Sequence, residues 1–207
     1  MPRDALSVEQ IVGTAIELLD DEGLDGLNMR ALGNRLGSAA TAIYWHLRTK
    51  DELVQLAADA LWAEVELPDL ENWREAATAM ATGLHAMLIR HPWLGQAFGS
   101  HLLSGPGKFR YDDRSLAIYV QAGFSPDDAD RAAATVLVFV IGSALSAAAQ
   151  VSLNHRLSRG ARNAEQTIQE SQEQATHPGT RGETTAHSTF TFGLNAILDG
   201  FEAQLRS

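Results

Sequence analysis

The feature that most constrains the fold of this chain is the spacing of its apolar residues, which recur every three or four positions over most of its length. Such spacing places apolar side chains on one face of an α-helix. The first run consists of Val8, Ile11, Val12, Ala15, Ile16 and Leu19. Ser7 and Gln10 form a capping-box pattern before this run, and Gly23 offers a stop after it. We therefore predict an all-α fold.

Three more helices follow. Asn28 is a suitable N-cap for a short second helix, and Gly37 at its end can adopt the positive φ of a tight turn. A third helix of about two turns fits residues 39–46. Thr49 and Glu52 form a second capping-box pattern, which opens a fourth helix. Three short helices with a glycine turn before the third have the layout of a helix-turn-helix unit, although spacing alone also allows a plain helical bundle.

The distribution of charge favours the helix-turn-helix. The whole chain has a net charge of −10, yet residues 26–50 carry Arg30, Arg35, Arg48 and Lys50 and no acid. By contrast, residues 1–25 carry one arginine against seven acids, and residues 51–207 carry eleven basic side chains against nineteen acids. A short basic window in an acidic protein is what a small phosphate-facing surface requires.

The remainder is predicted to be a larger helical body. Its expected helices cover residues 71–89, residues 113–121, a small-residue-rich stretch from residue 127, and residues 188–205. The sequence Ser104-Gly105-Pro106-Gly107-Lys108 is interpreted as a flexible connector or a pocket rim. The polar segment 154–187 is expected to be a mobile loop with one helix over residues 164–175.

Composition argues against several functional classes. The chain has no cysteine, which excludes a disulfide framework, thiolate catalysis and a zinc–sulfur site. The longest apolar stretch, residues 132–145, is interrupted by polar or small residues, and acids near the start argue against a signal peptide, so we expect a cytoplasmic protein. The Glu-x-x-His spacing of a di-iron bundle does not occur, and the glycine loop lacks the residues of a phosphate-binding motif. We expect no enzymatic activity, no metal and no cofactor.

Several motifs resemble the DNA-binding signature of the TetR family of transcriptional regulators. They are Gly23-Leu24, Arg30-Ala31-Leu32, Leu36-Gly37 and the run from Ile43 to Leu53. A looser likeness continues through Trp73, His91-Pro92-Trp93, Gly123-Phe124-Ser125-Pro126 and residues 192–200. The resemblance implies an all-α homodimer that acts as a repressor and leaves a palindromic operator when a small, mostly apolar ligand binds.

The same resemblance implies a domain organisation. An N-terminal helix-turn-helix DNA-binding domain is expected over residues 1–50, joined by a connecting helix over residues 51–66 to a larger regulatory domain over residues 67–207. This C-terminal domain is expected to bind the ligand and to dimerise through the helix around residues 130–152 and the final helix, residues 188–205.

Four residues match family positions that contact DNA, namely Arg30, Tyr44, His46 and Lys50. Tyr44 and His46 can offer hydrogen bonds to phosphate oxygens, and Lys50 in the first turn of a helix can share a phosphate with backbone amides. Arg30 suits either guanine or phosphate, and the sequence leaves both open.

Base reading is expected from Ala40, Thr41 and Ala42. Alanine methyl groups can contact thymine methyl groups but make no hydrogen bonds, so the operator cannot be deduced from them. Trp45 is expected to be buried, wedging the third helix against the first. An alanine-rich recognition helix keeps a competing hypothesis open, which is an all-helical enzyme or ligand-sequestering protein with a vestigial DNA-binding bundle.

The ligand pocket is expected to be lined mainly by apolar side chains, which suits a mostly apolar molecule. The candidates are Met80, Leu84, Met87, Leu88, Phe98, His101, Leu102, Leu116, Tyr119, Val120 and Phe139. His101 or Tyr119 would orient the ligand, while for any single residue a plain core role is the alternative. Phe98 stands where tetracycline-binding members carry a histidine, which argues against tetracycline. For His91, before its proline, we expect a hydrogen-bonding or capping role.

Overall fold

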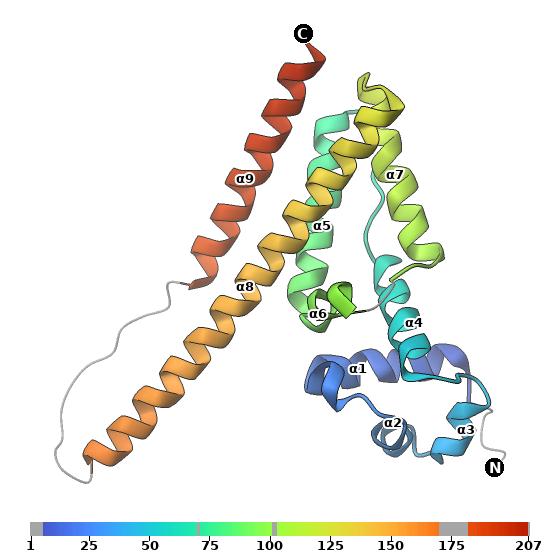
Figure 1. Cartoon of the computed structure of the whole chain (residues 1–207), viewed down its shortest axis with the longest axis vertical. Helices are drawn as coiled ribbons and strands as arrows, with labels where there is room; N and C mark the ends of the chain where they lie inside the picture. The colour runs from blue at the N-terminus through green and yellow to red at the C-terminus, as the bar shows by residue number, and fades with distance from the viewer. Residues whose placement is uncertain (1–5, 70, 101–102, 170–181, 207) are drawn as a thin grey trace.

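The computed structural model describes residues 6–69, 71–100, 103–169 and 182–206. For residue 100 and for the described residues between 151 and 187 it describes the backbone alone. Within these ranges every regular element is a helix (Figure 1), which confirms the predicted all-α class. The helices are α1 (Val8–Gly26), α2 (Met29–Leu36), α3 (Ala40–Tyr44), α4 (Lys50–Trp62), α5 (Trp73–Arg90), α6 (Trp93–Ser100), α7 (Pro106–Ala122), α8 (Pro126–Gln169) and α9 (Gly182–Leu205).

The first three helices and the first turn of α4 form a compact unit, here called the reader, at one end of the molecule (Figure 1). Its capping signals fold as predicted. Ser7 Oγ accepts a hydrogen bond from Gln10 N at 3.2 Å, and Gln10 Oε1 accepts one from Ser7 N at 3.0 Å. Asn28 caps α2, and Gly37 ends it in the left-handed region with φ 60°. Gly23, with φ 70°, kinks α1 at the predicted stop.

The third and fourth helices depart slightly from expectation. α3 covers only Ala40–Tyr44, so it is shorter than the predicted 39–46. Thr49 Oγ1 accepts a hydrogen bond from Glu52 N at 3.0 Å, but the Glu52 carboxylate accepts one from Arg48 N at 2.8 Å rather than from Thr49 N. α4 then runs from the reader into the rest of the molecule and packs on both α1 and α7.

One continuous apolar core joins the reader to the larger body. In α4, Leu53, Leu61 and Trp62 are all buried and belong to the same cluster as side chains of α1, α5 and α8. α5 and α7 pack against α8, and α9 packs on α8 from another side. Because α4 shares its core with both ends, a displacement in the body can reach the reader through this helix.

Two elements of the body differ from the sequence prediction. α6 (Trp93–Ser100) was not predicted, since it is short and contains two glycines. α7 begins at Pro106, well before the expected start at residue 113, and proline is well suited to the first helical position. The segment from Ser104 to Lys108 is therefore not a flexible connector, because its second half is the first turn of a helix.

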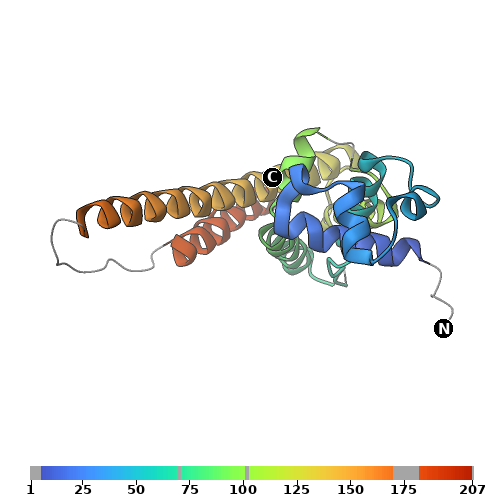
Figure 2. The ribbon, with the colours of Figure 1, turned by 90° about the horizontal axis from the view of Figure 1, so that it is seen from below.

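α8 is the longest helix, with 44 residues and a length of about 66 Å. The predicted loop is wrong for residues 154–163, whose backbone continues α8, whereas the predicted helix over residues 164–175 agrees with the backbone as far as residue 169; residues 170–181 lie outside the described part. α9 begins at Gly182, ahead of the predicted residue 188. Figures 1 and 2 show the second half of α8 projecting beyond the other helices.

The first part of α8, Pro126–Gln150, is long and apolar enough to cross a membrane by length and composition, and only 22% of the most apolar window is buried. Helices at the core of soluble proteins pass the same test. From the sequence alone, the small or polar residues of this stretch argue against a membrane span. Gly142 and Ser143 nevertheless leave its mean hydropathy high enough for one. A large part of this apolar helix is therefore left uncovered by the rest of the chain.

Candidate DNA-binding surface and regulatory core

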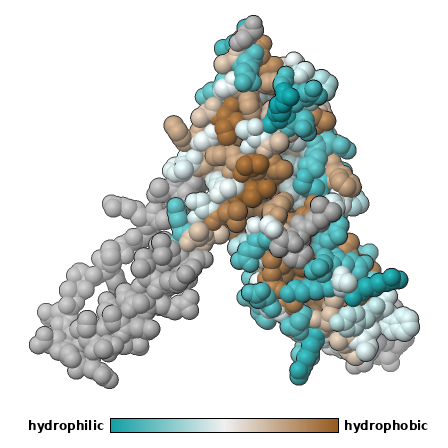
Figure 3. Space-filling view, in the orientation of Figure 1, coloured by the Kyte–Doolittle hydropathy of each residue, from teal (hydrophilic) through white to brown (hydrophobic). Residues whose placement is uncertain are grey.

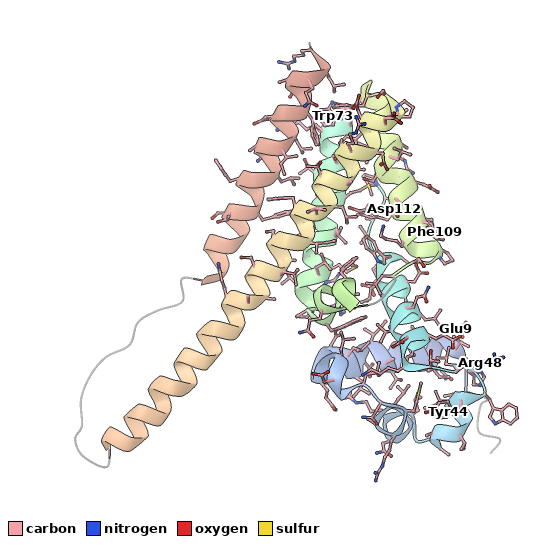
Figure 4. All side chains as sticks on the ribbon, viewed as in Figure 1. Glu9, Tyr44, Arg48, Trp73, Phe109 and Asp112 are labelled. Carbon is pink, nitrogen blue, oxygen red and sulfur yellow. The ribbon has the colours of Figure 1, made fainter. Side chains whose placement is uncertain are left out.

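The predicted DNA contacts are accessible in the folded chain. Tyr44 is 53% exposed, and Arg30, Thr41 and His46 are also exposed, whereas Ala40 and Ala42 are half-buried. Ile43 and Leu47 are buried and anchor α3 on the reader. Tyr44 and Arg48 are labelled in Figure 4 and lie at the end of the reader remote from α5, α8 and α9. The geometry therefore leaves these side chains free to meet a partner.

The prediction for Trp45 is wrong, because its side chain is 88% exposed rather than wedged into the core. Ile43 and Leu47, four residues apart, already fill the inner face of this segment. Trp45 is two residues away from both Ile43 and Leu47, and two residues correspond to about 200° around a helix. Helical periodicity therefore predicts that Trp45 lies on the outer face. The exposed indole lies next to the exposed Tyr44 in the chain and adds an apolar side chain to the candidate surface, which the sequence did not predict.

The basic window is less uniform in space than in sequence. Arg35 Nη2 lies 2.7 Å from Asp21 and 3.5 Å from Glu22, two acids of α1. The hydrogen bond to Asp21 is the main cause of a raised Arg35 pKa. Arg30 and Arg48, by contrast, form no ion pair with residues that the structure describes. Their charges therefore remain available, and Arg48 joins the candidate surface although the sequence reading did not single it out.

Lys50 is half-buried, and its Nζ donates a hydrogen bond to Leu24 O at 2.5 Å. This bond fixes the side chain beside the end of α1. A carbonyl oxygen does not neutralise the ammonium charge, and an ammonium has three donors, so two remain for a phosphate. Lys50 can thus hold both the reader and a DNA backbone.

The predicted ligand residues fall into three groups. Met80, Leu84, Met87, Leu88 and Tyr119 are buried in the common core, and Phe98 and Phe139 are partly buried against it. Leu116 and Val120 of α7 are 36% and 43% exposed and do not belong to the common core, so their place in a pocket stays a prediction. His101 and Leu102 lie outside the described residues.

Two hollows adjoin this set. One hollow lies between α5, α6 and α8 and is lined in part by Leu88. Its volume of about 10 Å³ has room for about one water molecule. The other, of about 320 Å³, is an open groove between α8 and α9 that includes Phe139, Ser143 and Thr189. Beside it, the buried His85 ring stacks on Phe190 with ring centroids 3.9 Å apart. Neither hollow gathers the predicted set into one cavity.

The body is fastened to α4 at a close joint with the start of α7. Asp59 accepts hydrogen bonds from the backbone amides of Gly107 at 3.1 Å and Lys108 at 3.0 Å. Gln55 Nε2 donates to Ser104 O at 2.8 Å. The two helices approach so closely that a Cβ atom on Gly107 would lie 2.4 Å from Asp59 O. We call this set the α4–α7 joint.

A second fastening joins α1 to α6. Asp20 Oδ1 accepts a hydrogen bond from Trp93 Nε1 at 2.9 Å and lies 2.8 Å from His91 Nδ1. His91 therefore has the hydrogen-bonding role expected for it. Within the described residues, no group of three or more histidine, aspartate or glutamate residues could hold a metal ion.

α8 and α9 together expose an apolar face. Val138 is 70% exposed, Leu145 42% and Phe192 77%. Figure 3 shows brown, apolar atoms gathered along the described part of α8, in contrast with the teal, polar surface of much of the reader. Gly193 allows close approach of these helices, since a Cβ atom there would lie 2.6 Å from Phe139 Cζ.

Two family models match this chain. Residues 11–57 match a model described as bacterial regulatory proteins, tetR family, and residues 67–205 match the tetracyclin repressor-like C-terminal domain. An HTH-type transcriptional regulator of Saccharopolyspora erythraea is 39% identical over 140 residues, 67% of this chain and 59% of that protein. The repressor DrrR1 of Streptomyces coeruleorubidus is 32% identical over 70% of this chain and 55% of its own length. The aligned part thus spans a little over half of each of these two relatives.

Other relatives align over nearly their whole length. The tetracycline repressor protein class E of Escherichia coli is 29% identical over 97% of this chain and 92% of the repressor. Among solved structures, ActR of Streptomyces coelicolor in complex with actinorhodin matches with a TM-score of 0.77 and 27% identity over 98% of both chains. A TetR variant from Acinetobacter baumannii AYE in complex with minocycline matches with a TM-score of 0.71 and 26% identity, covering 98% of this chain and 99% of the other. The family models, these relatives and the helix-turn-helix geometry agree, and the chain belongs to the TetR family of transcriptional regulators.

Proposed function

We propose that this protein is a homodimeric repressor that binds a palindromic operator through α3 and leaves it when a small, mostly apolar ligand occupies the larger domain. The observation that carries the proposal is the exposed cluster of Arg30, Tyr44, Trp45, His46 and Arg48 on an otherwise acidic chain. Residues 1–50 would form the DNA-binding domain, residues 51–66 the connecting helix, and residues 67–207 the regulatory domain. The protein acts in the cytoplasm, where its DNA is, and has no catalytic role.

On DNA, the contacts divide into positioning and reading. Lys50, Tyr44 and His46 hold phosphates and set the register of α3, while Arg48 adds a free charge near them. Ala40, Thr41 and Ala42 face base edges, and Arg30 contacts guanine or a phosphate. The exposed ring of Trp45 adds an apolar surface beside these contacts.

The second copy covers the apolar face of α8 and α9. Val138 and Phe192 are large apolar side chains that are mostly exposed in the single chain. In a dimer with a two-fold axis, both side chains of each protomer would be buried. Such a dimer places two recognition helices about 34 Å apart, which matches successive major grooves on one side of a duplex.

Release follows from a population shift. The ligand must bind more tightly to the arrangement that does not fit DNA, and α4 transmits the difference because it shares its core with both ends. ActR was solved with actinorhodin and a TetR variant with minocycline, so relatives with the same fold hold sizeable organic molecules. The mostly apolar core residues of α5 favour a ligand of low polarity here.

Selection of bound sequences from random duplexes tests this proposal. The expected result is a palindromic motif whose half-sites lie about one helical turn, roughly 10 base pairs, apart. Lys50→Ala should weaken binding to all recovered sequences alike, since it removes a phosphate contact. Recovery of no enriched sequence would show that the reader is vestigial and would leave the ligand-sequestering alternative.

A further inference from the structure

Among the residues that the structure describes, the indole nitrogen of Trp62 on α4 is a buried polar group without a hydrogen-bond partner. The Trp62 side chain is 1% exposed, and its Nε1–H has no hydrogen-bond acceptor in the described part of the chain. Trp93, also buried at 3% exposure, donates its indole N–H to Asp20 at 2.9 Å. A buried donor without an acceptor is costly, and such groups are rare in folded proteins. A bound molecule that supplied an acceptor to the Trp62 Nε1–H would therefore remove this cost.

Its surroundings come from α6 and α7. The Tyr111 ring centroid lies 4.8 Å from that of Trp62, and the Phe98 ring meets Trp62 edge-on at 6.2 Å. Tyr111 is buried, and its hydroxyl forms no hydrogen bond with any described residue. Burial is the main cause of a raised Tyr111 pKa, so this hydroxyl keeps its proton and is a second donor. Two neutral donors thus border a cluster of aromatic rings.

The charge beside the indole limits what the acceptor can be. Lys108 Nζ lies 5.1 Å from the centre of the Trp62 ring, but it is bound to both carboxylate oxygens of Asp112 at 2.5 Å. An anionic ligand would have to compete with Asp112 for this one cation and would lose its hydration on entering an apolar cluster. A neutral acceptor avoids both costs, and a carbonyl oxygen, with two lone pairs and no charge, is such an acceptor.

We propose that the effector of this protein is a planar aromatic compound with a carbonyl oxygen, which enters between α4, α6 and α7 and accepts a hydrogen bond from Trp62 Nε1. This inference rests on the proposed function and specifies the ligand class. The site adjoins the α4–α7 joint, since Lys108 belongs to both. A ring that enters beside Trp62 must separate α7 from α4, where Gly107 leaves no spare room, so binding and displacement of α4 are one event.

The test uses two probes of nearly equal shape, 1-indanone and indane, which are the same bicyclic ring system with and without a carbonyl. The indole N–H signals of ¹⁵N-labelled protein are followed during titration, and the Trp62 signal is assigned from its loss in Trp62→Phe and from contacts with the rings of Phe98 and Tyr111. We expect 1-indanone to shift the Trp62 signal downfield and to bind about tenfold more tightly than indane. In Trp62→Phe that preference should fall to about one, whereas Trp93→Phe should keep it.

Two results would overturn the inference: no shift of the Trp62 signal with millimolar 1-indanone, or an undiminished carbonyl preference in Trp62→Phe. If Trp62→Phe does not fold, the shift of the Trp62 signal in the wild-type protein alone tests the inference. DNA binding is measured separately on the same preparation. Loss of the proposed function would appear as absence of DNA binding, whereas failure of this inference alone would leave DNA binding intact and the Trp62 signal unmoved.

Discussion

The α4–α7 joint gives a sharp prediction for Gly107→Ala. The added Cβ would lie 2.4 Å from the backbone oxygen of Asp59, about 1 Å inside the ordinary contact distance of 3.4 Å, and 3.3 Å from Ala63 N. Both neighbours are backbone atoms, one within α4 and one at its C-cap, so rotation of a side chain cannot relieve the overlap. Either α7 moves away from α4 or α4 moves with its reader.

The magnitude follows from the geometry. Asp59 lies about 13 Å along α4 from Lys50, so a 1 Å displacement at the joint tilts α4 by about 4°. Overpacking of this kind costs about 1–3 kcal/mol. If half of that cost, about 0.5–1.5 kcal/mol, falls on the arrangement that fits DNA, affinity for the selected duplex drops about two- to thirteenfold in the absence of any ligand.

The assay is fluorescence anisotropy of a labelled duplex, with unfolding by denaturant measured in parallel. Gly13→Ala is the matched control, because a Cβ atom there meets nothing within 4 Å and the residue lies within α1. The control should keep its DNA affinity and gain up to about 1 kcal/mol of stability from helix propensity. A Gly107→Ala protein that loses stability but binds DNA as well as wild type would refute the coupling through α4.

Further predictions concern the joint, the core and the dimer. Asp59→Ala removes two hydrogen bonds from the start of α7 and should cost about 1–2 kcal/mol of unfolding free energy in denaturant titrations. Trp62→Phe should destabilise the protein less than Trp93→Phe, since only the latter loses an indole hydrogen bond, and equal losses would contradict the assignment of Trp62. Burial raises the pKa of Tyr111 and Tyr119 above the ordinary 10.0. The free energy of unfolding should therefore keep its full contribution from these groups below pH 10 and decline above pH 10, because the two tyrosines ionise more readily in the unfolded chain. In alkaline denaturation, Tyr111→Phe should make this decline with pH less steep. Val138→Asp places like charges across the two-fold interface and should weaken dimerisation about a hundredfold in sedimentation, while Phe109→Asp on α7 should not.

The sequence predicted the reader well because its signals are local. A capping box, an asparagine cap and a glycine with positive φ each act within four residues, so Ser7, Asn28 and Gly37 could be interpreted without knowledge of the rest of the fold. The exposure of Tyr44 and His46 followed from the same short-range logic. Trp45 was misplaced because its size was given more weight than its position between Ile43 and Leu47.

The parts that sequence reasoning missed depend on contacts between distant residues. The start of α7 is stabilised by Asp59 of α4, some way back along the chain, so the glycines of residues 105 and 107 resembled a loop. Arg35 belonged to an acid-free window, yet α1 brings Asp21 and Glu22 beside it. The unpartnered Trp62 nitrogen is visible only when the packing of α4, α6 and α7 is known.

The central claim is that a small positive surface on the reader binds DNA despite the negative charge of the whole chain. It is tested most directly by the salt dependence of duplex binding in wild type, Lys50→Ala and Arg35→Ala. Each lost phosphate contact lowers the slope of log affinity against log salt by about 0.9, so Lys50→Ala should reduce it by about two in a dimer. Arg35→Ala should leave the slope unchanged, because Asp21 and Glu22 already occupy that cation. A slope for Lys50→Ala equal to that of wild type would contradict the account.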